Sequence, residues 1–212
     1  MPGEEVWLEG DLWTPEPPDL GGGGDGGTGA VLLHPHPAYG GTMWNNVVSA
    51  IFDALKERGV PVLRFNFRGV GRSGGHHGGG LPEVNDALAA VSEFGRRVGC
   101  TCSWLVGYSF GAAVAAAAAG KTDHVGGFVA VAFPFGFLPT FAYAARVAKP
   151  KLFVQGTRDD VAPLREFKAQ YASIPEPKQC ALVEGADHFF SGHEERVAAE
   201  VVGFLADAPR TR

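Results

Sequence analysis

Short runs of apolar residues alternate along this chain with longer segments in which apolar residues recur every three or four positions. Runs rich in β-branched residues are typical of buried strands, and the three-to-four spacing is typical of amphipathic helices. The pattern predicts helices whose apolar positions span 47–55, 84–98, 110–119 and 197–205. It predicts strands over residues 30–33, 60–67, 103–106, 127–133, 151–155 and 179–183.

The order of these elements indicates the fold class. Apolar strands that alternate with helices are typical of a parallel sheet covered on both faces. Residues 6–14 alternate between apolar and polar positions and predict antiparallel strands at an edge of that sheet. We therefore expect an α/β fold with a single domain over residues 1–212, a length that suits one domain. Two glycine-rich stretches, 19–29 and 74–80, predict flexible loops.

Composition argues against several classes of partner. The net charge is −5 at pH 7 and lysine and arginine do not cluster, whereas nucleic acids and anionic membranes require a concentrated basic surface. The acidic N-terminus and the lack of an apolar stretch near roughly 18 residues predict a cytoplasmic protein without a membrane span. Three cysteines, an odd number in or beside predicted strands, predict buried free thiols rather than disulfides.

One glycine motif points to a competing function. Residues 69–74 match G-x-G-x-x-G directly after an apolar run, the pattern of a dinucleotide-binding loop. Such a site also needs a helix that opens at once and an acidic residue about 20 positions later at a strand end. Here a run of glycines and histidines follows (75–80), no helix can start before Pro82, and Glu93 falls inside a predicted helix. A dinucleotide-binding oxidoreductase therefore stays only as a less favoured alternative.

A second glycine motif, GYSFG at 107–111, joins a predicted strand to a predicted helix. A serine at such a turn is held in a strained and exposed conformation, and small residues two positions before and after it let the two backbones approach closely. A chance match is common in a chain with 31 glycines, but the strand before and the alanine-rich helix after favour a nucleophile elbow. Ser109 is the predicted nucleophile.

A serine hydroxyl needs a histidine to remove its proton and a carboxylate to orient that histidine. Both types follow Ser109 at the ends of later predicted strands: first Asp159 or Asp160, and then His188 with His193 close behind. Each residue alone has an ordinary explanation, as a turn aspartate or a packed loop histidine. Together they form an ordered set, because the carboxyl ends of parallel strands share one edge of the sheet.

Five segments carry a family resemblance: VLLHPHP (31–37), RFNFRGVGRS (64–73), GYSFG (107–111), GTRDDVAP (156–163) and GADHFF (185–190). Together they resemble the α/β-hydrolase superfamily, in particular its small lidless members of the dienelactone-hydrolase-like and intracellular esterase kind. The resemblance covers nearly the whole chain and implies the α/β-hydrolase fold without a cap domain. One departure is Asn66, where many relatives carry aspartate, and this change removes no catalytic group.

The family pattern assigns the remaining roles. Its acid stands three positions after a glycine and four before a proline, which selects Asp159 over Asp160. Its base directly precedes an aromatic pair, which selects His188, and His193 is then expected to open or cap the last helix. Three other histidines are interpreted as solvated loop residues: His76, His77 and His124.

The resemblance implies a serine hydrolase that cleaves a small or medium carboxylic ester or thioester through a Ser-His-Asp triad and an acyl-enzyme. The expected partner is a small ester substrate, with no cofactor, metal, nucleic acid or membrane span. The sequence leaves open the acyl and leaving groups, an amide in place of the ester, and the oligomeric state. A catalytically silent hydrolase-fold protein that binds partners through the same surface is the alternative from another functional class.

The oxyanion that develops in such a reaction requires preorganised N–H donors. One is expected from the backbone of Phe110, the residue after the nucleophile. The other is expected in the segment HPHP (34–37), where proline has no N–H and the N–H of the first histidine belongs to the sheet or its support. His36 is therefore the expected second donor, with Ala38 as the alternative. A metal site at this histidine pair would lack further ligands.

Aromatic residues gather between positions 133 and 143. Phe135, Phe137 and Phe141 are candidate substrate-pocket residues, and ordinary core packing is an equal alternative, because aromatic residues dominate buried area. The segment is too short to fold as a cap domain, so the site is expected to be open.

Overall fold

The computed structural model describes residues 6–15, 29–137 and 141–207. Within them, strands form a seven-stranded sheet in the order β1-β3-β2-β4-β5-β6-β7. β1 pairs antiparallel with β3 at one edge, and the other neighbouring strands are parallel. The predicted α/β fold with a mostly parallel sheet is confirmed. The strands are β1 (Gly10–Trp13), β2 (Gly29–Leu33), β3 (Val62–Phe65), β4 (Ser103–Tyr108), β5 (Val125–Val131), β6 (Lys151–Gly156) and β7 (Lys178–Val183).

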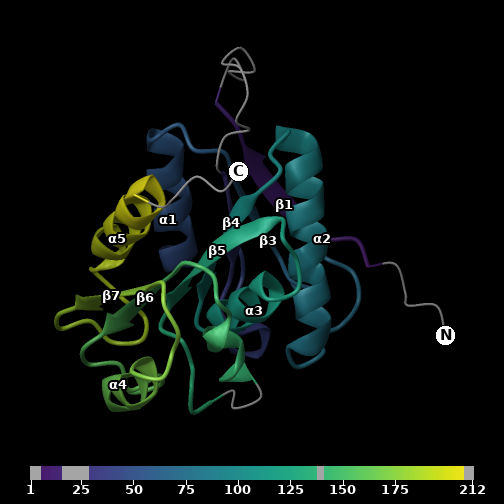
Figure 1. The fold of residues 1–212 in the computed structure, drawn as a ribbon. Coiled ribbons are helices and arrows are strands. Elements are labelled where there is room, and N and C mark those ends of the chain that lie inside the picture. Colours follow the sequence, from purple (N-terminus) through teal and green to yellow (C-terminus); the bar gives the residue numbers. More distant parts are fainter. Residues whose placement is uncertain (1–5, 16–28, 138–140, 208–212) are drawn as a thin grey trace.

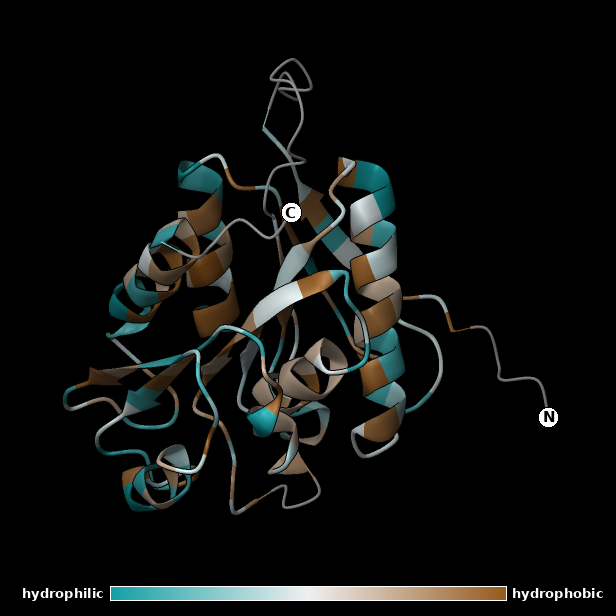
Figure 2. Cartoon of the chain, viewed as in Figure 1, coloured by the Kyte–Doolittle hydropathy of each residue, from teal (hydrophilic) through white to brown (hydrophobic). Residues whose placement is uncertain are grey.

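Helices cover both faces of the sheet (Figure 1). On one face α2 (Leu81–Val98) and α3 (Phe110–Ala119) pack on a core that includes Leu105, and on the other α1 (Asn46–Glu57) and α5 (Glu194–Asp207) pack on a core that includes Val106. Neighbouring residues of a strand face opposite sides, so a strand buried on both sides is apolar along most of its length. The outer helices turn their hydrophobic stripes toward the sheet and their polar residues outward (Figure 2).

The ends of the helices follow from their capping residues. The Asn45 side chain accepts the N–H of Val47 and begins α1. Gly99, in the left-handed region at φ 74°, ends α2, where a residue with a Cβ would be strained. α3 is mostly alanine and almost entirely buried, which is typical of a helix that is surrounded by other elements.

The structure adds a helix that the hydrophobic pattern did not predict, α4 (Leu164–Tyr171). Its apolar residues Leu164, Phe167 and Tyr171 do recur at helical spacing, but the helix has only 8 residues and Phe167 is its single buried one, so the pattern is too short to mark it. Two short 3₁₀ turns also appear, η1 (Pro37–Tyr39) and η3 (Ala144–Arg146). β4 runs two residues further than predicted and ends directly before Ser109.

Two other expectations are only partly met. The stretch 74–80 forms no helix or strand, whereas residues 19–28 lie outside the described part of the chain and Gly29 opens β2. None of the three cysteines, all of which the structure describes, forms a disulfide, as predicted, but only Cys100 is buried; Cys102 is half-buried and Cys180 is exposed, so the expected burial was wrong for Cys180. Cys180 lies on β7, an edge strand whose residues are mostly exposed or half-buried because the sheet ends there.

Candidate active site

Ser109 lies in the turn between β4 and α3 with φ 54° and ψ −114°, a strained conformation for a residue other than glycine. The two glycines of the motif permit this turn. A Cβ on Gly107 would lie 2.1 Å from the carbonyl oxygen of Gly111, and a Cβ on Gly111 would lie 2.3 Å from the carbonyl oxygen of Leu33. The turn therefore has the close backbone approach that the sequence predicts.

The predicted base and acid meet at Ser109. His188 Nε2 lies 3.0 Å from Ser109 Oγ, and His188 Nδ1 lies 2.8 Å from Asp159 Oδ2. A carboxylate only accepts hydrogen bonds, so Nδ1 carries the proton and Nε2 is left to accept one from the serine hydroxyl. The three residues come from the ends of β4, β6 and β7, which the sheet brings together.

Backbone amides hold the Asp159 carboxylate. Its Oδ1 accepts the N–H groups of Val161 at 2.9 Å and Ala162 at 2.7 Å, and Gln155 Nε2 lies 3.3 Å from Oδ2. Asp159 is buried, whereas Asp160 is exposed. The structure thus brings Asp159, and not its neighbour, to His188.

Tyr108 is a contact that the sequence reasoning missed. Its hydroxyl donates to the backbone carbonyl of His188 at 2.6 Å, and both groups are buried. Burial raises the pKa of Tyr108, and the nearby Asp159 raises it further, so the hydroxyl keeps its proton. The tyrosine directly before the serine was the available signal. His193, the rival base, directly precedes α5 and its carbonyl accepts the N–H of Val197, as expected for a residue that opens the helix.

The loop after β2 carries the two predicted histidines. His36 N–H has no hydrogen-bond acceptor within the described part of the chain, whereas the Ala38 N–H donates to the His36 ring at Nδ1, 3.1 Å away. The alternative donor is therefore occupied. The His36 carbonyl accepts the N–H groups of Tyr39 and Gly41, which close the loop into η1.

Phe110 is the first residue of α3, so its N–H lies at the helix N-terminus, where no intrahelical acceptor exists. The Phe110 ring packs against the His36 ring with centroids 4.9 Å apart. The two residues predicted to stabilise the oxyanion are therefore neighbours, one on the loop after β2 and the other at the start of α3.

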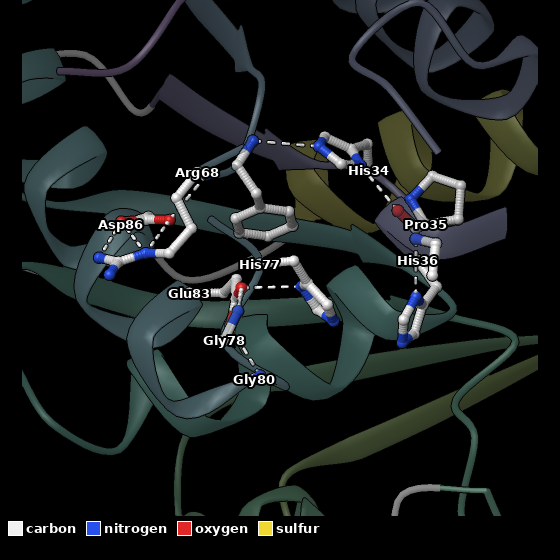
Figure 3. Close-up of polar contacts among 11 residues, drawn as sticks. His34, Pro35, His36, Arg68, His77, Gly78, Gly80, Glu83 and Asp86 are labelled. Carbon is white, nitrogen blue, oxygen red and sulfur yellow. Dashed lines mark hydrogen bonds and ion pairs between the residues drawn. The ribbon is translucent and has the colours of Figure 1, made fainter. Parts of the chain in front are cut away.

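His34 ties this loop to the next one. Its ring is buried, Nδ1 lies 2.7 Å from the Pro35 carbonyl oxygen, and Nε2 accepts the Phe67 N–H at 3.0 Å (Figure 3). A carbonyl only accepts and an amide N–H only donates, so the proton is on Nδ1.

The loop after β3, whose sequence matches the dinucleotide motif, is held by two buried carboxylates of α2. Arg68 makes a two-pronged ion pair with Asp86, and Glu83 accepts the N–H groups of Gly78 at 2.7 Å and Gly80 at 2.6 Å (Figure 3). α2 begins only at Leu81, so this loop does not present a helix N-terminus to a phosphate.

One prediction about this loop was wrong. His77 is not a solvated histidine: its Nδ1 lies 2.8 Å from Oε1 of the wholly buried Glu83, and its ring packs against those of His36 and Phe110. A glycine-rich loop can fold a histidine back into the protein, and sequence alone does not show this. His76 and His124 are exposed, as expected.

A cavity of about 460 Å³ opens beside Ser109 and His188. Of the three candidate pocket residues, Phe137 lines it, whereas Phe135 and Phe141 are buried in the core, where Phe135 packs on Phe133 at 4.4 Å between ring centroids. Among the described residues that line this cavity there is no aspartate, glutamate, lysine or arginine. The sequence reasoning missed the other exposed apolar residues of its wall: Tyr39, Val161 and Phe189.

The described residues contain neither a candidate membrane span nor a candidate metal site. No helix among them combines the length and apolar character needed to cross a membrane. Within the same residues, no three histidine, cysteine, aspartate or glutamate side chains gather in a way that could hold a metal ion.

Comparison with known proteins reveals clear likenesses. The sequence model of the alpha/beta hydrolase domain family matches residues 28–201. An uncharacterized protein of Rickettsia prowazekii (strain Madrid E) is 30% identical over 184 residues, which make up 83% of this chain and 77% of that protein. The resemblance seen in the sequence motifs is thereby confirmed.

Two solved structures are similar over almost the whole chain. An alpha-beta serine hydrolase homologue from Coxiella burnetii is 34% identical with a TM-score of 0.82, and the match covers 95% of this chain and 97% of that one. A serine hydrolase without a lid from Xanthomonas campestris is 27% identical with a TM-score of 0.83, and the match covers 97% of this chain and 91% of that one.

Proposed function

The chain belongs to the alpha/beta hydrolase domain family, and on that basis we propose that it is a serine hydrolase of small or medium carboxylic esters or thioesters. The observation that carries the proposal is the continuous set of contacts from Ser109 Oγ to His188 at 3.0 Å and from His188 to Asp159 at 2.8 Å. This set opens onto a cavity large enough for a small ligand.

In the proposed reaction Ser109 Oγ attacks the carbonyl carbon of the ester while its proton passes to His188 Nε2. The carbonyl oxygen becomes an oxyanion that the N–H groups of His36 and Phe110 would stabilise. The C–O or C–S bond then breaks, and the leaving alcohol or thiol takes the proton from His188. Water, activated by the same imidazole, releases the acid and restores the serine.

The Asp159 carboxylate has two tasks in this scheme. It keeps the His188 proton on Nδ1, and it stabilises the imidazolium that forms when Nε2 receives the serine proton. Phe137 and the exposed wall residues around it would contact the acyl or leaving group. A cytoplasmic location stays a prediction from the sequence.

The test is labelling by a fluorophosphonate probe, which reacts with activated serines. We expect the wild-type protein to be labelled, and Ser109→Ala to lose the label together with at least about 10⁴-fold of p-nitrophenyl butyrate turnover. Ser92→Ala, an exposed serine on α2, is the control and should keep both.

Three other outcomes would contradict the proposed function or the proposed nucleophile. A folded wild-type protein that takes no label and hydrolyses no ester would indicate a catalytically silent binding protein. NADH or NADPH binding in the same preparation would favour the dinucleotide-binding alternative. Turnover that persists in Ser109→Ala would contradict the proposed nucleophile.

A further inference from the structure

The His36 imidazole forms part of the cavity wall beside Ser109. Its Nδ1 accepts the Ala38 N–H at 3.1 Å, so this nitrogen has no proton, and in the neutral ring the proton is on Nε2. Nε2 lies on the opposite edge of the ring from that bond (Figure 3). Among the described residues it has no hydrogen-bond partner, and it is not one of the buried unpaired atoms. An N–H donor is therefore available at the wall of the cavity.

This donor is uncharged at neutral pH. Partial burial lowers the pKa of His36, and the nearby His77 lowers it further, while Glu83 acts in the opposite direction. A neutral imidazole N–H donates to uncharged oxygen without attracting anions, and none of the described residues that line the cavity is an aspartate, glutamate, lysine or arginine. The wall thus favours an uncharged acceptor over a carboxylate.

Aromatic neighbours hold the ring in one orientation. Its centroid lies 4.8 Å from that of His77, 4.9 Å from Phe110 and 5.2 Å from Tyr39. His77 is itself held against the buried Glu83 (Figure 3). A donor that is already fixed loses little side-chain freedom when a ligand binds, so its hydrogen bond contributes more to selectivity.

We propose that His36 has a second role as a specificity-determining residue, in which its Nε2–H donates to an uncharged oxygen of the substrate. The substrate class is an ester or thioester whose acyl or alcohol chain carries an ether, ketone or hydroxyl oxygen near the reacting carbonyl. This inference rests on the proposed function, and it concerns the side chain of His36, not its backbone N–H.

Two variants separate the two nitrogens of the ring. In His36→Asn the short amide can take the place of Nδ1 and accept the Ala38 N–H, but it cannot reach the position of Nε2. In His36→Gln the longer amide can donate from the position of Nε2, but no side-chain atom accepts the Ala38 N–H. His76→Asn, at an exposed histidine of the neighbouring loop, is the control.

The probes are pairs of esters in which one methylene is replaced by oxygen. p-Nitrophenyl methoxyacetate is compared with p-nitrophenyl butyrate for the acyl side, and 2-methoxyethyl acetate with butyl acetate for the alcohol side. The two esters of a pair differ in chemical reactivity. The quantity of interest is therefore kcat/KM for the ether ester divided by kcat/KM for the alkyl ester, and this ratio in each variant is divided by the same ratio in the wild-type enzyme.

In at least one pair we expect this normalised ratio to fall about threefold to tenfold in His36→Asn, the loss of one neutral hydrogen bond. It should stay within about twofold in His36→Gln and His76→Asn. Unchanged ratios in His36→Asn for both pairs would overturn the inference, and so would an equal fall in His36→Gln. A wild-type protein that hydrolyses nothing and takes no fluorophosphonate would instead refute the proposed function.

A measurement on the wild-type protein does not depend on how the variants fold. The ¹⁵N spectrum of the imidazoles reports which ring nitrogen carries the proton. We expect His36 to carry it on Nε2. A proton on Nδ1 would remove the donor from the cavity wall and overturn the inference.

Discussion

Mild acid should weaken the folded state through His34, a histidine without a part in the proposed chemistry. Its ring is wholly buried between two loops, and Nε2 already accepts the Phe67 N–H. A proton on Nε2 would make this nitrogen a donor that faces the Phe67 N–H, itself a donor, and the buried positive charge would be shielded from solvent. Burial accordingly lowers the pKa of His34 to about 4, although the Pro35 carbonyl acts in the opposite direction.

The sign and size of the effect follow from linkage. In the unfolded chain His34 has its ordinary pKa, 6.5. Below that pH the unfolded state binds a proton at His34, whereas the folded state binds it only near pH 4. Stability is therefore lost as the pH falls between these values. The full difference is about 3 kcal/mol, and about 2 kcal/mol of it is lost by pH 5. That is a large part of the 5–15 kcal/mol typical of native proteins.

The assay is urea unfolding at pH 7 and pH 5, followed by tryptophan fluorescence. Other groups also titrate in this range, so the wild-type protein is compared with His34→Gln, in which the amide oxygen can accept the Phe67 N–H but cannot take a proton. Whatever its stability at pH 7, the variant should lose about 2 kcal/mol less than wild type on going to pH 5. An equal loss in both proteins would refute the reasoning. So would an NMR titration of the His34 ring with a midpoint near 6.5.

Three more predictions concern the site. Asp159→Asn should lower kcat for p-nitrophenyl butyrate at least about 100-fold, whereas Asp160→Asn should change it less than about threefold, because only the buried Asp159 carboxylate contacts His188. Equal losses in the two variants would mean that the wrong acid was chosen. Tyr108→Phe should lower the free energy of unfolding in urea by about 1–3 kcal/mol and lower kcat with little change in KM, because the buried His188 carbonyl loses its donor. An unchanged free energy of unfolding and an unchanged kcat would refute this. Gly111→Ala should reduce fluorophosphonate labelling severely, since its Cβ would lie 2.3 Å from a backbone oxygen of the neighbouring strand, and full labelling would contradict the model of the elbow.

The local pattern was enough to predict the layers of the fold and the strand-to-helix turn at Ser109. Buried strands are mostly apolar, and the buried faces of helices repeat every three to four residues, so the order of residue types along the chain indicates which positions are buried. The elbow at Ser109 is also a local requirement, because two backbones that approach this closely admit only glycine at positions 107 and 111. α4 was not predicted because it has only 8 residues, and its three apolar positions, Leu164, Phe167 and Tyr171, make too short a pattern to indicate a helix.

Contacts between loops could not be predicted in this way. The sheet order determines which segments become neighbours, and only the folded chain shows that Tyr108 reaches the His188 carbonyl or that His77 packs against His36 and Phe110. Likewise, the sequence gives no means of telling Phe135 from Phe137. Only the packing of the folded chain shows that Phe135 is buried in the core and that Phe137 lines the cavity. Sequence spacing therefore determined which residue types stand at the ends of the strands, while the tertiary structure decided which of their atoms meet, because such contacts depend on chain segments far apart in the sequence.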